Sequence, residues 1–79
     1  MPGLRDLPEA KGDRHVKAFK RFGWDHCRSN GSHKILEKDG VEAILSIPCG
    51  GSKNVKRRLL ASQIKLAGLT FEEYIEAFK

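Results

Sequence analysis

The sequence predicts a single α+β domain in which a three-stranded antiparallel sheet carries helices on one face, in the order α-β-β-β-α, plus a short C-terminal helix. Three observations support this class. Apolar residues recur at helical spacing before residue 23 and after residue 54. Between these segments the apolar period changes to two. Two dipeptides typical of hairpin turns, Asn30-Gly31 and Asp39-Gly40, divide the central segment into three runs.

The N-terminal part is expected to contain an arm and one helix. Residues 1–11 include two prolines and show no helical pattern, so we predict an extended arm ahead of a single domain over residues 12–79. Asp13 can cap a helix that continues to about Phe22, and Gly23 ends it. The apolar face of this helix is formed by Val16, Phe19 and Phe22.

Three strands are expected over residues 24–29, 32–38 and 41–48. If both turns are two-residue loops, Arg28 lies opposite His33, Ile35 opposite Ile44, and His33 opposite Ser46. The face that helices cover then consists of Cys27, Leu36, Val41, Ala43, Leu45 and Ile47. The open face consists of Trp24, His26, Arg28, His33, Ile35, Glu37, Glu42, Ile44 and Ser46.

The C-terminal third predicts two further helices. The first spans about residues 55–67 and is ended by Gly68. Its buried stripe is formed by Leu60, Ile64 and Ala67. Thr70 and Glu73 form a capping-box pattern that starts a short last helix. The apolar positions of that helix are Phe71, Tyr74, Ile75 and Phe78.

The charge distribution indicates an anionic partner. The net charge is +5, and residues 52–68 carry five cations and no acid. Three of these cations, Lys56, Arg57 and Arg58, stand at the start of the second predicted helix, where the helix dipole also favours phosphate. Lys53 precedes them. This asymmetry favours nucleic acid as the ligand.

The remaining composition excludes several classes. No apolar run approaches the roughly 18 residues that span a bilayer, and two cysteines do not form a disulfide framework. We therefore expect a cytoplasmic protein without a membrane partner. The potential metal ligands are His26, Cys27, His33 and Cys49. Their spacing matches no zinc motif, so we predict no metal and no cofactor.

The segment Gly31-Ser32-His33 is the best candidate for chemistry. Metal-free RNA cleavage needs a base for the ribose 2′-OH, an acid for the leaving oxygen and cations for the phosphate, and histidine titrates in the useful range. His33 is the candidate acid or base. Arg28 is expected to bind the phosphate, and Ser32 and Ser46 to orient reacting groups.

The chain resembles the HicA-type toxin family, and its order of elements resembles double-stranded-RNA-binding domains. The residues that carry this resemblance are Leu7-Pro8, the run from Ala18 to Trp24, the run from Arg28 to His33, Ile47-Pro48, and the run from Ile64 to Tyr74. The resemblance implies a metal-independent endoribonuclease that cleaves mRNA. It also implies that His33 is the catalytic residue and that a HicB-type antitoxin covers this site.

Two features differ from the family pattern and leave other functions open. Cys49 and glycines follow Pro48 where many members have a second histidine, and Lys56-Arg57-Arg58-Leu59 replaces a Gly-Thr-Leu that often opens the last helix. One alternative is a non-catalytic RNA-binding module of the same fold. Another is a small protein-interaction domain that uses a surface formed by Trp24, Ile35 and Ile44.

Overall fold

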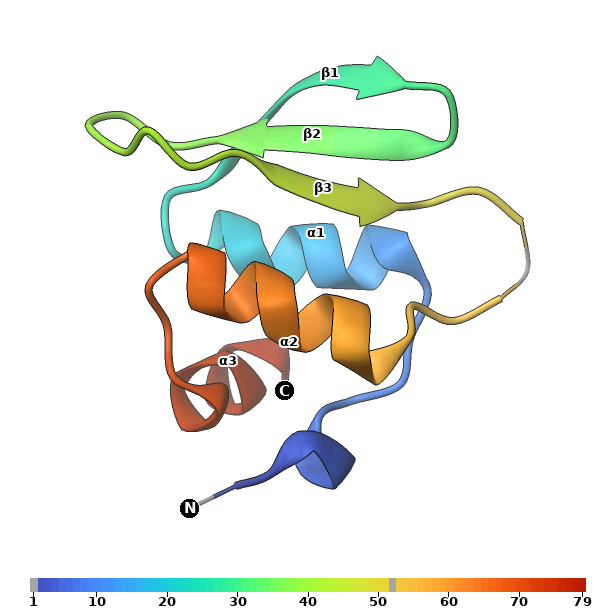
Figure 1. The fold of residues 1–79 in the computed structure, drawn as a ribbon, viewed down its shortest axis with the longest axis vertical. Helices are drawn as coiled ribbons and strands as arrows, with labels where there is room; N and C mark the ends of the chain where they lie inside the picture. The colour runs from blue at the N-terminus through green and yellow to red at the C-terminus, as the bar shows by residue number, and fades with distance from the viewer. Residues whose placement is uncertain (1, 52) are drawn as a thin grey trace.

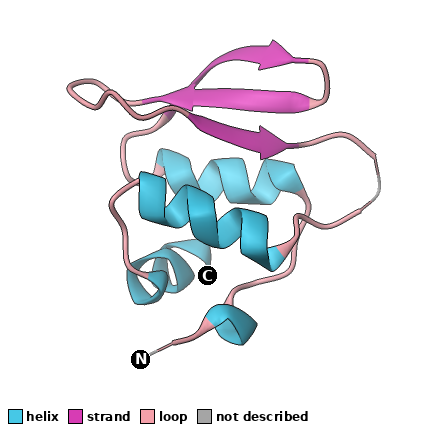
Figure 2. Ribbon diagram, in the orientation of Figure 1, coloured by secondary structure: helices cyan, strands magenta, loops and turns pink. Residues whose placement is uncertain are grey.

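Figure 1 shows the fold in a computed structural model that describes residues 2–51 and 53–79. The three strands are β1 (Asp25–Asn30), β2 (His33–Glu37) and β3 (Leu45–Pro48), and they form one antiparallel sheet in the order β1-β2-β3. The helices are η1 (Leu4–Asp6), α1 (Gly12–Lys20), α2 (Arg57–Leu66) and α3 (Phe71–Phe78). Helices α1 and α2 lie against one face of the sheet, and α3 lies on their far side (Figure 2). The predicted α+β class is confirmed.

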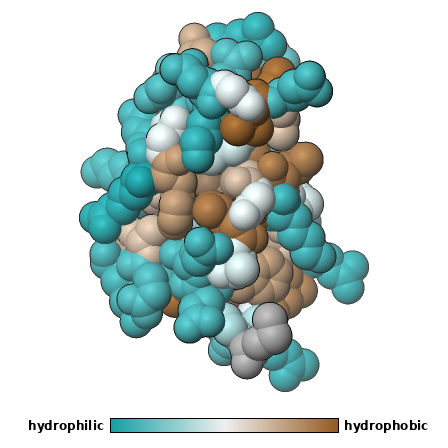
Figure 3. Space-filling view, turned by 90° about the vertical axis from the view of Figure 1, so that its left-hand side faces the viewer, coloured by the Kyte–Doolittle hydropathy of each residue, from teal (hydrophilic) through white to brown (hydrophobic). Residues whose placement is uncertain are grey.

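The core lies between the sheet and the helices. Its fully buried side chains include Phe19, Trp24, Leu36, Leu45, Ile47, Leu60, Ile64 and Tyr74. Burial of each large apolar side chain contributes on the order of 2 kcal/mol. The apolar residues at one side of this layer reach the surface, where Figure 3 shows them gathered in the middle of the face and bordered by hydrophilic side chains.

Trp24 corrects the prediction for the open face of the sheet. Its side chain is completely buried, and β1 begins one residue later. The cause is the connection from α1, where Gly23 has a φ of 94° and the Trp24 amide donates to the Phe19 carbonyl at 3.4 Å. Trp24 therefore ends the helix-to-strand turn and packs into the core. Because Ile35 is also only 8% exposed, the protein-interaction surface of Trp24, Ile35 and Ile44 does not exist.

The start of α1 also differs from the prediction. Lys11 is the N-cap and no side chain caps the helix, so Asp13 lies within the first turn and does not cap it. Asp13 instead accepts a hydrogen bond from Lys34 of β2 at 2.7 Å. The first residue, Gly12, lies so close to β3 that a Cβ there would overlap the Pro48 carbonyl oxygen and stand 2.7 Å from the Cys49 sulfur.

The N-terminal residues are attached to α2. Leu7 is 1% exposed, and its carbonyl accepts a hydrogen bond from Arg57 Nε at 2.9 Å. The same guanidinium forms an ion pair with Glu9 at 2.7 Å. Val55 was expected inside the second helix, but α2 begins at Arg57 and the Val55 amide donates to the Ala10 carbonyl.

The predicted start of the last helix is confirmed in detail. Thr70 Oγ1 accepts a hydrogen bond from the Glu73 amide at 3.1 Å, and Glu73 Oε1 accepts one from the Thr70 amide at 2.9 Å. Gly68, with a φ of 76°, follows the end of α2 as expected. The apolar positions of α3 pack on the core.

The register of the first hairpin was predicted incorrectly. Asn30 pairs with His33, and Arg28 pairs with Ile35, so the two loop residues are Gly31 and Ser32. The reason is turn chemistry. An Asn-Gly type I′ turn needs a positive φ at both residues, but in the described chain only glycines have one. Gly31 has a φ of 63° and begins the turn, which is the pattern of a type II′ turn.

The second hairpin is also longer than predicted. Leu36 pairs with Leu45 and Ile35 with Ser46, so the strands end before a loop over residues 38–44. Val41 and Ile44 were expected in a strand but lie in this loop and are 40% and 46% exposed. A bulge between His26 and Arg28 exposes Cys27, which was expected on the covered face.

His15 is a buried histidine that links α1 to α3. Its side chain is completely buried, and its Nδ1 lies 2.5 Å from the Tyr74 hydroxyl. Its ring also packs on Phe78, with a centroid distance of 5.3 Å. Burial lowers the pKa of His15 to about 4, despite an opposing contribution from the backbone of Ala10. The ring is therefore neutral in the folded protein near pH 7.

We predict that Gly12→Ala destabilises the domain. In an open helix the change would stabilise by up to about 1 kcal/mol, because alanine has the higher helix propensity. Here the new Cβ overlaps the Pro48 carbonyl, so we expect a net loss of about 2 kcal/mol in the free energy of unfolding, measured by urea denaturation. Gly3→Ala is the control, since the nearest atom to its Cβ is 4.0 Å away. Equal stability of both variants would contradict the close contact.

We predict that stability falls on acidification through His15. In the unfolded chain the pKa of His15 is near 6.5 and in the folded protein it is about 4. Between these pH values the unfolded state is protonated at His15 and the folded state is not. The contribution of His15 to stability is complete well above pH 6.5 and decreases by on the order of 3 kcal/mol as pH falls to 4. The melting temperature of His15→Gln, measured across this range, should depend less on pH than that of the wild type or the control His26→Ala. An unchanged slope in His15→Gln would exclude this assignment.

Candidate functional site

The described residues form a small hollow of about 190 Å³ at the end of the sheet where β1 turns into β2. The residues that line it are Ser29, Gly31, Ser32, His33, Lys34, Cys49 and Gly50. The predicted motif Gly31-Ser32-His33 therefore forms one side of a concave surface, and the segment that follows β3 forms the other.

His33 is the first residue of β2 and is exposed. Its cross-strand partners are Asn30 of β1 and Pro48 of β3, so it occupies the central strand of the sheet. The tight turn before it and the pairing on both sides hold its backbone. The imidazole is thus presented to solvent from a fixed position, as a group that acts on a bound substrate requires.

The loop after β3 is held against the β1–β2 turn. The Cys49 amide donates a hydrogen bond to the Ser32 carbonyl at 2.7 Å. Gly50 lies so close that a Cβ there would overlap the Ser32 Cβ. Only glycine fits this position without displacing the turn. The contact between two loops far apart in the sequence creates the hollow, and sequence patterns contain no signal for it.

Lys34 and Cys49 also line the hollow but were not among the predicted site residues. The Lys34 ammonium pairs with Asp13 at 2.7 Å on the helix-facing side of the sheet. This hydrogen bond and charge raise the pKa of Lys34 and lower that of Asp13. Burial, with the nearby Asp13 charge, raises the pKa of the Cys49 thiol. Lys34 is therefore a permanent cation, and Cys49 is a neutral thiol at neutral pH.

The structure changes the predicted neighbours of His33. Arg28 and Ser46 both lie opposite Ile35, two residues farther along the strand than expected. They still share the open face with His33, and a diagonal neighbour is within reach of a long side chain such as Arg28. His26 pairs with Leu36 and therefore projects on the other face, where its Nε2 lies 3.1 Å from Ser29 Oγ.

The basic residues after the hollow separate into two groups. Lys53, Lys56 and Arg58 are exposed in the loop after β3 and at the start of α2. Arg57 is half-buried, and its guanidinium is already bound to Glu9 and to the Leu7 carbonyl. The structure thus gives Arg57 an internal role in attaching the N-terminal arm, whereas the other three cations face solvent.

The four side chains considered as metal ligands do not converge. His26 and Cys27 lie on β1, His33 at the turn and Cys49 beyond β3. Across residues 2–51 and 53–79, no group of three or more His, Cys, Asp or Glu side chains is arranged to hold a metal ion. No helix in the same residues is long and apolar enough to cross a membrane.

These features define a small α+β protein with an exposed histidine in a surface hollow and cations around it. A family model described as the HicA toxin of bacterial toxin-antitoxin systems matches residues 12–69. The match covers well over half of the chain, and the protein belongs to this family of toxins. No curated protein matches the sequence. Membership in a toxin-antitoxin family also indicates an antitoxin partner.

Proposed function

We propose that this toxin is a ribonuclease that cleaves mRNA and that His33 is its catalytic general acid or base. The observation that supports this most directly is the position of His33 at the rim of the hollow, exposed on the central strand. The open face of the sheet leaves the imidazole accessible to a flexible single strand of RNA. The site of action would be the cytoplasm, where mRNA is translated.

The reaction requires two proton transfers and a cation at the phosphate. A base removes the proton from a ribose 2′-OH, the 2′-oxygen attacks the adjacent phosphorus, and the bond from phosphorus to the 5′-oxygen breaks as that oxygen takes up a proton. His33 is proposed to transfer one of these protons. Arg28 is proposed to bind the phosphate across the open face. Lys34 lines the hollow, but its ammonium is already paired with Asp13.

The neighbouring residues have supporting roles in this proposal. Gly31 supplies the turn that places His33, and the Ser32 and Ser46 side chains are available to orient the substrate. Lys53, Lys56 and Arg58 continue the positive surface from the hollow to the start of α2, where the helix dipole favours phosphate. We assign no phosphate contact to Arg57, because its guanidinium already binds Glu9 and Leu7.

We propose that the antitoxin is of the HicB type and neutralises the toxin by covering the His33 face. The hollow is shallow and lies on the molecular surface, so a protein that docks on the open face of the sheet can exclude RNA from it. The antitoxin can therefore block the hollow without inserting a segment into the core of the toxin. Loss of toxicity on complex formation then follows from simple steric exclusion.

We predict that His33→Ala abolishes toxicity and RNA cleavage. Loss of a general acid or base typically lowers the rate by 10²- to 10⁴-fold. Growth after induction and the appearance of cleaved mRNA are the two measurements. His26→Ala is the matched control, because His26 is an exposed histidine in the same hairpin but on the other face of the sheet. It should remain toxic.

A His33→Ala protein that is folded, binds RNA and is still fully toxic would show that the catalytic assignment is wrong. If the wild type binds RNA with strong salt dependence but yields no cleavage product, the protein is a non-catalytic RNA-binding module. Cys49 and Gly50 are the reason to make this comparison, since they stand where many family members have a second histidine.

A further inference from the structure

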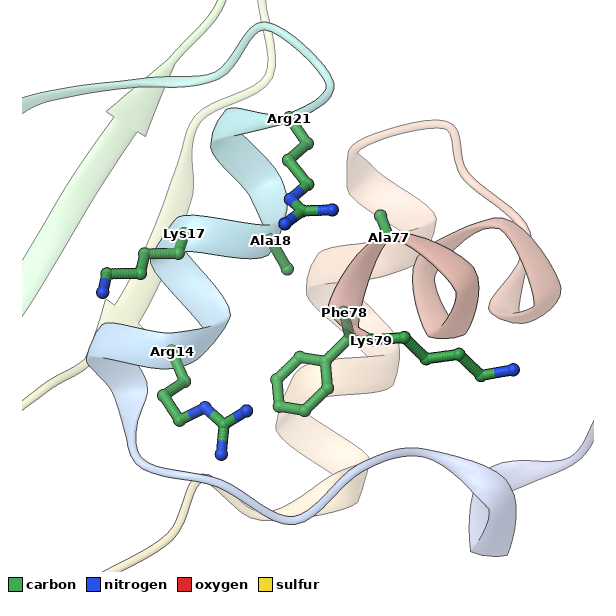
Figure 4. A pocket seen from close by; sticks show the side chains of 7 residues that line it. All are labelled: Arg14, Lys17, Ala18, Arg21, Ala77, Phe78 and Lys79. Carbon is green, nitrogen blue, oxygen red and sulfur yellow. The ribbon is translucent and has the colours of Figure 1, made fainter.

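A second concave surface lies between α1 and α3, away from the hollow. It is a groove of about 340 Å³, and Figure 4 shows the side chains that line it. Arg14 and Arg21 extend into the groove from α1, and Lys17 lies at its edge on the side of the sheet. Phe78 of α3 forms the opposite wall, with the Arg14 guanidinium 5.0 Å from the centre of its ring.

The positive charge of this groove is not neutralised within the described structure. Arg14 and Lys17 lie one turn apart on α1, and Arg21 follows four residues later as the C-cap. Like charges at these spacings destabilise a helix by a few tenths of a kcal/mol per pair. Among the described residues none of the three forms an ion pair, whereas Lys79 at the far wall is paired with Glu76 at 3.2 Å. The three side chains are therefore available to an anionic ligand.

An acidic residue, Asp13, lies between the groove and the hollow. Lys17 is close enough to Asp13 to lower its pKa, and Asp13 holds Lys34, which lines the hollow at His33. Asp13 and Lys34 neutralise each other, so among the described residues the unpaired positive charge on this side of the molecule is that of Arg14, Lys17 and Arg21.

We propose that the groove between α1 and α3 binds the phosphate backbone of RNA outside the hollow, with Arg14 and Arg21 as its principal contacts. The choice of RNA rests on the proposed ribonuclease function. An acidic protein is the less suitable ligand, because the hot spots of protein interfaces lie in well-packed pockets that exclude water, with aromatic and Arg anchors. Here Phe78 is the large apolar side chain of the groove, and its ring already packs against Arg14.

The test uses the complete protein and a labelled 2′-O-methyl RNA of about 20 nucleotides, which exceeds the site of a small single-strand-binding module. This RNA cannot be cleaved through its 2′-oxygen, so binding is measured whether or not His33 is catalytic. The variant is Arg14→Gln/Arg21→Gln. The control is Arg5→Gln/Lys65→Gln, which removes two exposed cations outside the groove and gives the same net charge.

For the groove variant we expect about tenfold weaker binding at physiological salt and a slope of log K against log salt smaller by about 1 to 1.5, as for two lost phosphate contacts on a single strand. The control should keep the wild-type slope. Equal slopes in both variants would overturn the proposal, and so would a polyglutamate peptide that binds as tightly as RNA and depends equally on Arg14 and Arg21.

Loss of cleavage in His33→Ala is measured separately, so the two proposals can fail independently. Single Arg21→Gln, which leaves the Arg14–Phe78 contact intact, shows whether any effect arises from altered folding.

Discussion

The close approach of Gly12 to Pro48 is the contact on which the site depends. It places the first turn of α1 directly against the end of β3, without room for a side chain between them. Asp13, the next residue, is near enough to bind Lys34, and the Cys49 amide extends the pairing of β2 with β3 to the Ser32 carbonyl. The hollow at His33 exists because these segments, distant in sequence, meet at one end of the sheet. Close packing of this kind tolerates little change in volume.

Some charged side chains of this protein form ion pairs within the fold, and others face solvent without a partner among the described residues. Ion pairs of Arg57 with Glu9 and of Lys34 with Asp13 attach the N-terminal arm and join the sheet to α1. Exposed pairs of this kind contribute at most about 1 kcal/mol each, so they organise the surface more than they stabilise the fold. Cations without such partners include Arg14 and Arg21 in the groove, and the molecule has a net charge of +5. An anionic ligand would relieve this repulsion.

Local patterns were reliable where a single segment decides the structure. The capping box of Thr70 and Glu73, the end of α2 at Gly68, and the number and order of strands were all predicted. The hairpin registers were wrong because two turns compete within Asn30-Gly31-Ser32, and the choice depends on pairing with β3 as well as on the dipeptide. Trp24 was misplaced because alternation cannot show where a strand begins, and its burial comes from packing against helices.

The sequence by itself determined the α+β class, the membership in a toxin family and the presence of an exposed histidine after a tight turn. These follow from short-range periodicity, turn residues and the order of motifs, which can all be read from residues close together in the sequence. Only the tertiary structure decided that Cys49 and Gly50 enclose the hollow, that Arg57 serves the fold, and that Arg14 and Arg21 face a groove completed by Phe78. Each of these depends on contacts between segments that are distant in the sequence, and at the hollow those contacts require glycine at Gly12 and Gly50.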